Sequence, residues 1–223
     1  ASQYTTVEIL RHMSGSEDLE RLQTEIDRLE RENEKLRISN RRWMRIAGTD
    51  GLTGLPNKVF FSTALLPQII SSANAEGRGF VCIMVAPDKL GDINQKYGRE
   101  GGDQIVNGLS EYLKENVEAD EKLVHIDGAN FVVIVPKGDQ AQAKRRTRQI
   151  RAQVVSRHFE CGGEAVTLTL SMGVTIQPAE PQGAGTKVKE VAEDLLRRMG
   201  VALDQAKKQG GDKVVEDFEA DEA

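Results

Sequence analysis

A short hairpin carries the most suggestive cluster of side chains in this chain of 223 residues. Residues 125–131 read His-Ile-Asp-Gly-Ala-Asn-Phe between two short apolar runs. The pair Asp127-Gly128 strongly favours a tight turn between antiparallel strands, because glycine takes the positive φ that such turns need. The tip then presents one carboxylate and the amide of Asn130.

Other reactive residue types are sparse. Cys82 and Cys161 lack metal-type spacing and are expected to be buried or incidental. The net charge of −5 speaks against a nucleic-acid partner, and no apolar run approaches the roughly 20 residues of a membrane span. No signal-peptide pattern opens the chain, so a cytoplasmic location is expected. The basic runs within 37–45 and 144–151 are interpreted as solvated helix faces rather than docking surfaces.

Together with an upstream motif, the hairpin resembles a known signature. Residues 50–57 read Asp-Gly-Leu-Thr-Gly-Leu-Pro-Asn. Further matches follow in order, at Asn94, Tyr97-Gly98, Gly102-Asp103, Ser171-Met172-Gly173-Val174, Ala202-Leu203 and Ala206-Lys207. This ordered set resembles the GGDEF family, the diguanylate cyclases, over roughly residues 47–215. The resemblance implies two half-sites, each binding one GTP with metal, that face each other in a dimer.

The resemblance also shows which ligands this chain lacks. In the family, the first aspartate of the motif that ends strand one and the third residue of the hairpin hold the metal. These positions are Ala86 and Ala129, and Pro87 follows the first of them. The family hairpin Gly-Gly-Asp/Glu-Glu-Phe here reads Asp127, Gly128, Ala129, Asn130 and Phe131. In phosphoryl chemistry the metal supplies the main electrostatic stabilisation. The family would use Mg²⁺ and GTP, but with both ligand positions lost we expect a pseudoenzyme without either cofactor.

An active diguanylate cyclase stays open as an alternative if Asp88 and Asp127 reach a metal from displaced positions. We favour another interpretation of Asp88, as a helix cap that follows strand one.

The positions that bind guanine in the family are better retained. They are Asn94 and Asp103, whose carbonyl and carboxylate can accept from the N1 and N2 donors of guanine. Lys207 matches a lysine that contacts phosphate, but its partner arginine falls on Gly211. At the product-inhibition site, residues 118–121 lack the arginine that grips cyclic-di-GMP. A sensor that binds GTP or cyclic-di-GMP without turnover is therefore a second alternative, with weak guanine-nucleotide binding.

A heptad repeat precedes the domain. Its a and d positions are occupied by Leu19, Leu22, Ile26, Leu29, Asn33, Leu36, Asn40, Trp43 and Ala47. Isoleucine at a with leucine at d favours a parallel two-stranded coiled coil, and asparagine at a fixes the register. The alternative is a single amphipathic helix that packs on the domain. We expect a homodimer through this segment.

The chain therefore divides into four parts: a linker or upstream remnant (1–15), a dimeric coiled coil (16–47), a degenerate GGDEF domain (48–215) and a disordered acidic tail (216–223). The expected domain elements are helices at 57–76, 100–116, 140–158 and 188–206, with strands at 80–85, 122–126, 131–135, 166–176 and 213–215. We expect an α+β fold, with a ferredoxin-like or nucleotide-cyclase-like sheet that is mostly antiparallel and has its helices on one side. The predicted function is an inactive signalling module, regulated through its coil and binding a protein partner.

Overall fold

The computed structural model describes residues 16–180 and 187–218, and within α2 the side chains from 19 to 40. The predicted linker, most of the predicted acidic tail and the side chain of Trp43 lie outside these residues. The chain divides into two units, Ala1–Ile46 and Ala47–Ala223, which are described separately. Within the described ranges, no helix is both long enough and apolar enough to span a bilayer.

The first unit consists of most of helix α2 (Ser16–Ala47). The apolar side chains of the predicted seam are exposed along it, at Leu19, Leu22, Ile26, Leu29 and Leu36. On the outer surface, Arg28 bridges Glu25 and Glu32, one helical turn away on either side. A helix with this exposed stripe and a charged opposite surface has the pattern of a coiled-coil strand.

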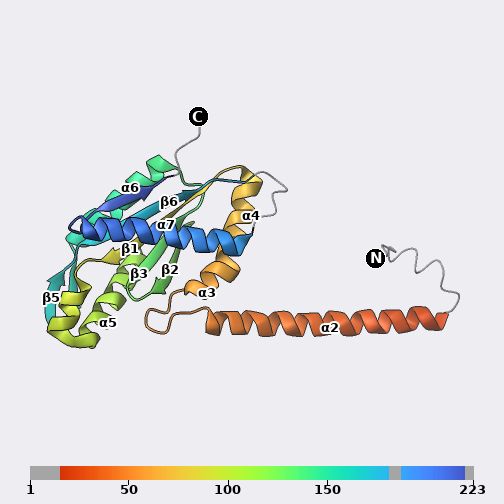
Figure 1. Cartoon of the computed structure of the whole chain (residues 1–223). Coiled ribbons are helices and arrows are strands. Elements are labelled where there is room, and N and C mark those ends of the chain that lie inside the picture. Colours follow the sequence, from red (N-terminus) through yellow and green to blue (C-terminus); the bar gives the residue numbers. More distant parts are fainter. Residues whose placement is uncertain (1–15, 181–186, 219–223) are drawn as a thin grey trace. The chain divides into compact units, whose positions relative to one another are not determined.

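The second unit is an α+β domain (Figure 1), as predicted. Its elements are α3 (Lys58–Phe60), the π-helical turn η1 (Phe61–Leu65), α4 (Leu66–Glu76), β1 (Phe80–Pro87), α5 (Leu90–Asn116), β2 (Lys122–Asp127), β3 (Asn130–Val135), α6 (Gln140–Val155), β4 (His158–Cys161), β5 (Glu164–Thr167), β6 (Leu170–Gln177), α7 (Val188–Lys208) and β7 (Val214–Asp217). The main sheet has the order β2-β3-β1-β6-β7, and its pairs are antiparallel except β6–β7.

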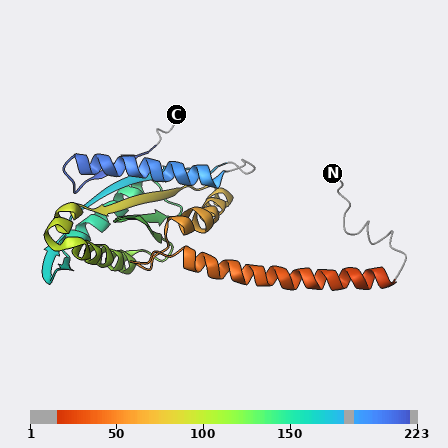
Figure 2. The ribbon, with the colours of Figure 1, turned by 60° about the horizontal axis from the view of Figure 1, so that its bottom comes forward.

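Helices cover both faces of this sheet, so the expectation of helices on one side is wrong. Figure 2 shows α7 and α5 on opposite sides of the strands. Side chains of α5 and α6 pack on one face, and those of α4 and α7 pack on the other. The continuous apolar run of β1 predicts this arrangement, because every residue of the strand is buried. In β6 the first six residues are buried as well.

Several predicted boundaries shift for local reasons. The helix predicted from 100 begins at Leu90, with a break at Gly98 where φ is +73°. The helix predicted to His158 ends at Val155, and the single strand predicted at 166–176 is two strands, because β5 pairs with β4 outside the main sheet. The edge strand β7 extends to Asp217, into the predicted tail.

Candidate functional site

The hairpin between β2 and β3 satisfies its own polar groups. Gly128 has a φ of +53°, as the predicted turn requires. The Asn130 Nδ2 donates to Asp127 Oδ1 at 2.7 Å, so the amide at the fourth motif position binds the carboxylate at the first. Ala129 is half-buried against the core cluster on the α5 side of the sheet. The tip therefore presents a closed amide–carboxylate pair rather than an open set of metal ligands.

The end of β1 is apolar where the resemblance places a metal ligand. Ala86 is 1% exposed and belongs to the core cluster that α4 and α7 cover. Its Cα partner across the sheet is Ser171 of β6. A methyl group in this environment offers no lone pair to a cation, and Pro87, which follows it, completes the strand.

Asp88 is not a helix cap, so that interpretation is wrong. The residue before α5 is Lys89, which is left-handed (φ +56°) and makes no side-chain cap. The buried Asp88 carboxylate accepts from Thr169 Oγ1 at 2.7 Å, Ser171 Oγ at 2.6 Å and the Asp212 backbone N–H at 2.8 Å. It therefore joins the end of β1 to β6 and to the turn that follows α7.

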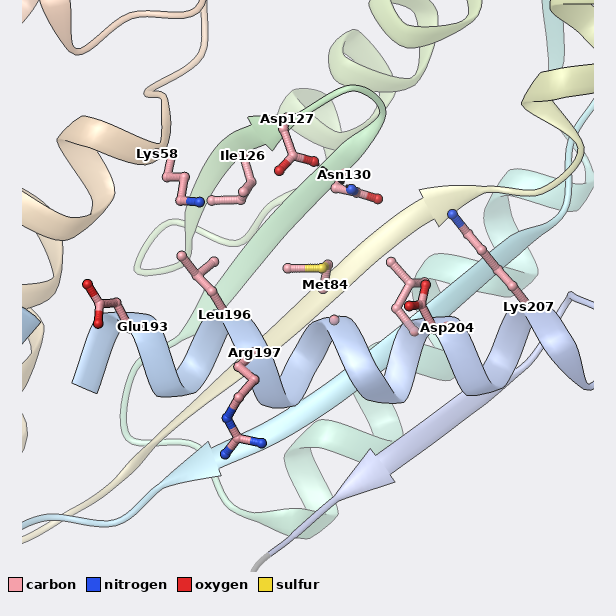
Figure 3. Close-up of a pocket in the computed structure, with 12 residues that line it drawn as sticks. Lys58, Met84, Ile126, Asp127, Asn130, Glu193, Leu196, Arg197, Asp204 and Lys207 are labelled. Carbon is pink, nitrogen blue, oxygen red and sulfur yellow. Dashed lines mark hydrogen bonds between the residues drawn. The ribbon is translucent and has the colours of Figure 1, made fainter. Parts of the chain in front are cut away.

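In that turn, Gly211 occupies the position at which the resembled family has a phosphate-binding arginine, and it lies close to Asp88. Helix α7 ends at Lys208, and Gly211 has a φ of +75°. A Cβ at Gly211 would lie 3.0 Å from the Asp88 Cγ and Oδ1. The Asp88 contact and the missing side chain at Gly211 thus belong to one packed arrangement. Lys207 is retained, and it extends beside the end of β1 (Figure 3).

Lys207 lines a groove of ≈ 490 Å³ between α7 and the hairpin. Met84 and Leu203 supply apolar surface, and Asp127 and Asn130 line the hairpin wall. Asp204 adds a second carboxylate beside Lys207, so the net positive charge there is small. Figure 3 shows Arg197 pointing away from the hairpin wall. The groove thus lacks the concentrated positive charge of a triphosphate site.

The two predicted guanine contacts lie together on α5. Asn94 is exposed on the first part of the helix and Asp103 is half-buried after the break at Gly98. A Cβ at Gly102 would overlap the Asn94 amide oxygen, so the amide rests directly on the turn that carries Asp103. Within the described chain, neither side chain has a hydrogen-bond partner. The structure thus brings an amide and a carboxylate together and leaves both free to accept donors.

The predicted product-inhibition position is occupied by a buried ion pair. Arg146 donates from Nε and Nη2 to the two carboxylate oxygens of Glu121, at 2.6 and 2.7 Å, and from Nη2 to the Asn116 carbonyl at 2.6 Å. The Arg146 and Glu121 side chains are 3% and 1% exposed. Interpreting the whole 144–151 run as a solvated face is therefore wrong for Arg146, which fastens α6 to the segment before β2.

The sequence analysis missed the role of His125. Its buried ring lies with Nδ1 2.9 Å from Asp50 Oδ1 and Nε2 3.0 Å from the Gly128 carbonyl oxygen, and it stacks on Phe131. Partial burial opposes ionisation of Asp50, but hydrogen bonds from Thr53 and His125 outweigh it and lower the pKa of that carboxyl. The available signal was a histidine two residues before the Asp127-Gly128 turn. The sequence does not show that Asp50 lies beside this histidine.

The donor set does not fit the metal of the resembled family. Among the described residues, no group of three or more histidine, cysteine, aspartate and glutamate side chains could hold a metal ion. Asp88 and Asp127, the two displaced candidates, already accept hydrogen bonds from protein donors. These protein donors compete with a cation for the carboxylate oxygens.

Sequence comparison identifies the family. The profile described as "Diguanylate cyclase, GGDEF domain" matches residues 47–213, and the chain belongs to this family. The response regulator PleD of Caulobacter vibrioides is 30% identical over 197 residues, which is 87% of this chain and 41% of PleD. Diguanylate cyclase DgcP of Pseudomonas aeruginosa is 25% identical, over 74% of this chain and 23% of DgcP. The chain thus spans about two-fifths or less of the length of these relatives.

Solved structures share the fold. Diguanylate cyclase SiaD of Pseudomonas aeruginosa, in complex with its activator SiaC, superposes with a TM-score of 0.68 and 23% identity, over 90% of this chain and 74% of that one. The coiled coil and GGDEF domain of DgcB from Caulobacter crescentus, in complex with c-di-GMP, gives 0.67 and 22%, over 88% and 99%. These neighbours establish the GGDEF fold for the domain.

Proposed function

We propose that this chain is a catalytically inactive GGDEF module, homodimeric through α2, that acts in cytoplasmic signalling by binding a protein partner. The observation that carries the proposal is the buried Ala86 at the end of β1, where the family resemblance places a metal ligand. Ala129 removes the second ligand. The internal hydrogen bonds of Asp88 and Asp127 support the proposal further, because they engage the carboxylates that could substitute.

Partner binding is supported by what the fold retains. The domain keeps the family fold and the residues 50–57 that follow α2, while alanine stands at positions 86 and 129, where the resemblance places the metal ligands. The SiaD structure contains an activator protein, which gives a precedent in the fold for recognising a protein. A module without turnover can still transmit a signal if its arrangement decides whether a partner binds.

The decisive experiment is a cyclase assay of the purified chain with GTP and Mg²⁺, beside an active GGDEF cyclase. We expect no cyclic-di-GMP. Turnover within a few orders of magnitude of the active enzyme would overturn the proposal and support the alternative of displaced ligands. The variant with Ala86→Asp and Ala129→Asp together tests the reason, because it restores both ligand positions. We expect that variant to gain Mg²⁺ affinity but no turnover, since Asn130 and Gly211 also differ from the family pattern.

Dimerisation through α2 has its own test. Ile26→Lys with Leu29→Lys places like charges across the predicted seam, and light scattering should then give half the molecular mass of the unchanged chain. The matched control, Thr24→Lys with Glu20→Gln, makes the same change in net charge at heptad positions outside the seam. A dimer that persists in the seam variant would show that the domains, rather than α2, hold the copies together.

A guanine-nucleotide sensor is the second candidate function. The specific observation in its favour is the pair of free acceptors, Asn94 and Asp103, held together across Gly102. Calorimetry with GTP, GDP and cyclic-di-GMP, with and without Mg²⁺, separates this function from a module that binds no nucleotide.

A further inference from the structure

His125 lies where the segment that enters the domain meets the hairpin. The segment after α2 is fastened by Asn57, whose Nδ2 donates to the Ala47 carbonyl at 2.8 Å and whose backbone N–H donates to the Gly48 carbonyl at 2.8 Å. The Asn57 Oδ1 also accepts the Val59 and Phe60 amides at the start of α3. The last residue of α2 is thereby fixed to the first helix of the domain.

The same segment contacts β2 at two levels. The His125 backbone N–H donates to the Pro56 carbonyl at 2.8 Å, which is a link between main chains. The His125 side chain makes the second link, because its ring reaches Asp50 on one side and the Gly128 carbonyl on the other. Asp50 Oδ1 also accepts the Thr53 N–H and hydroxyl, both at 2.8 Å. Only the side-chain link extends to the tip of the hairpin.

We infer that Asp50, Thr53, His125 and Gly128 form a junction clamp that transmits displacement of the segment after α2 to the hairpin turn. The ring is rigid, its side chain is 5% exposed and it stacks on Phe131 with centroids 4.7 Å apart. A shift of Asp50 therefore moves the ring, and the ring acts on the Gly128 carbonyl. Lys114 secures the other side, since its Nζ donates to the Thr53 carbonyl at 2.7 Å.

The consequence lies in the groove beside α7. The turn carries Asp127 and Asn130, and both line that groove. With the clamp closed, the Asn130–Asp127 hydrogen bond and the groove wall keep one arrangement; with it open, the turn is free to take another. The inference rests on the proposed function, with the added premise that α2 regulates the module, and it names His125 as the positioning residue. The surface that His125 positions is this wall of the groove.

Two substitutions, tested in the chain of 223 residues, separate the halves of the clamp. In His125→Asn the amide nitrogen takes the place of Nδ1, so it keeps the bond to Asp50 and loses the bond to Gly128. In His125→Gln the amide reaches the place of Nε2 and loses Asp50. Lys137→Gln is the matched control, because it removes a surface ion pair with Glu76 at a different site.

The experiment measures hydrogen–deuterium exchange of the amides at 128–131 after Asp50→Asn. Asp50 makes no hydrogen bond with these amides, so a purely local role leaves them unchanged. With His125 present, we expect exchange about five- to tenfold faster, the effect of one lost hydrogen bond. In the His125→Asn and His125→Gln backgrounds, the added Asp50→Asn change should have no further effect. Unchanged exchange with His125 present, or an equal effect in all backgrounds, would overturn the inference.

A second measurement links the clamp to α2. Four residues inserted after Asn40 shift the heptad phase upstream of the junction. In the unchanged chain and in the Lys137→Gln control, we expect the insertion to alter the exchange rates of the amides at 128–131. In the His125→Gln variant, we expect the insertion to leave those rates unchanged. A response that persists with His125→Gln would also overturn the inference. Neither measurement uses nucleotide or partner, so the clamp can fail while the cyclase assay still supports inactivity, and the reverse also holds.

Discussion

The two ends of the candidate site differ in what their polar groups bind. At the metal end, Asp88 accepts three protein donors and Asp127 accepts the Asn130 amide, while Ala86 supplies only a methyl group. At the guanine end, Asn94 and Asp103 lie side by side without a hydrogen-bond partner in the described chain. The carboxylates at the first end accept hydrogen bonds from protein donors, whereas the acceptors at the second end remain available to a ligand.

This difference shows how a site without the side chains that hold metal in the resembled family can satisfy its remaining carboxylates. Buried polar groups need hydrogen-bond partners, so a carboxylate that holds no metal is stable only if protein donors replace the cation. Thr169, Ser171 and the Asp212 amide do this for Asp88. Asn94 is exposed and Asp103 is half-buried, so water can serve as the hydrogen-bond partner where no protein donor is present.

Ala86→Asp gives the largest expected effect on stability, because it places a carboxylate at a buried apolar position. The new carboxylate would lie in the apolar cluster under α7 without donors, and should lower the free energy of unfolding by about 2–4 kcal/mol. Urea unfolding in EDTA measures the loss, and Ala86→Ser is the control for size. Mg²⁺ should restore part of the loss only if Ala129→Asp is also present. Full stability of Ala86→Asp in EDTA would show that donors for a carboxylate still exist there.

Gly211→Ala tests the packing of the metal end with a smaller effect. The positive φ and the Asp88 carboxyl 3.0 Å from the new Cβ should together cost about 1–2 kcal/mol in thermal or urea unfolding. Gly200→Ala is the matched control on α7, where nothing lies within 4 Å of an added Cβ. That change should stabilise by about 0.5–1 kcal/mol, as alanine does inside a helix. Equal effects would show that Gly211 is not held against Asp88.

The guanine end should bind without help from the metal end. If Asn94 and Asp103 recognise the base alone, GTP, GDP and guanosine should bind with affinities within about threefold of one another, with or without Mg²⁺. Asp103→Ala should weaken binding about tenfold, as expected for a lost hydrogen bond to a charged group. Calorimetry measures both. A strong preference for GTP in Mg²⁺ would mean that the phosphate end still functions.

Local signals in the sequence predict most of the fold and little of the site. The strand at 80–85, the Asp127-Gly128 turn and the helix that starts near Asn57 are each decided by neighbouring residues, and each was predicted. The break between β5 and β6 was missed, because an alternating run has the same pattern whether it stays in one sheet or leaves it. Asp88 was misassigned because its donors lie 81, 83 and 124 residues away. No local pattern reports partners at such separations.

The same limit applies to the lost ligands. The alanines at 86 and 129 are visible in the sequence, and the resemblance shows which positions they occupy. The sequence does not show whether nearby acids replace them, because that depends on which donors the fold brings to each acid. The hydrogen bonds of Asp88 and Asp127, which bear on this question, form only once the strands and the turn after α7 are in place.

Asp50 supplies the last and smallest test, which is a dependence of stability on pH. Its pKa is lowered in the folded chain, since hydrogen bonds from Thr53 and His125 outweigh its partial burial. The unfolded carboxyl has a pKa of about 3.9, so the unfolded chain binds more protons as the pH falls through that value. The stability from Asp50 is therefore fully present above that value and is lost as the pH falls through the lower folded pKa.

Asp50→Asn should remove this part of the slope of unfolding free energy against pH. The difference in stability between the unchanged chain and Asp50→Asn should be largest near neutral pH and shrink towards pH 3, as measured by urea unfolding at several pH values. The side chain is 27% exposed, which keeps the effect below those of the buried substitutions. Asp103→Asn is the control at the guanine end, where no hydrogen bond holds the carboxylate. If the stability difference for Asp50→Asn stayed constant from pH 7 to pH 3, folding would not lower the pKa of the Asp50 carboxyl.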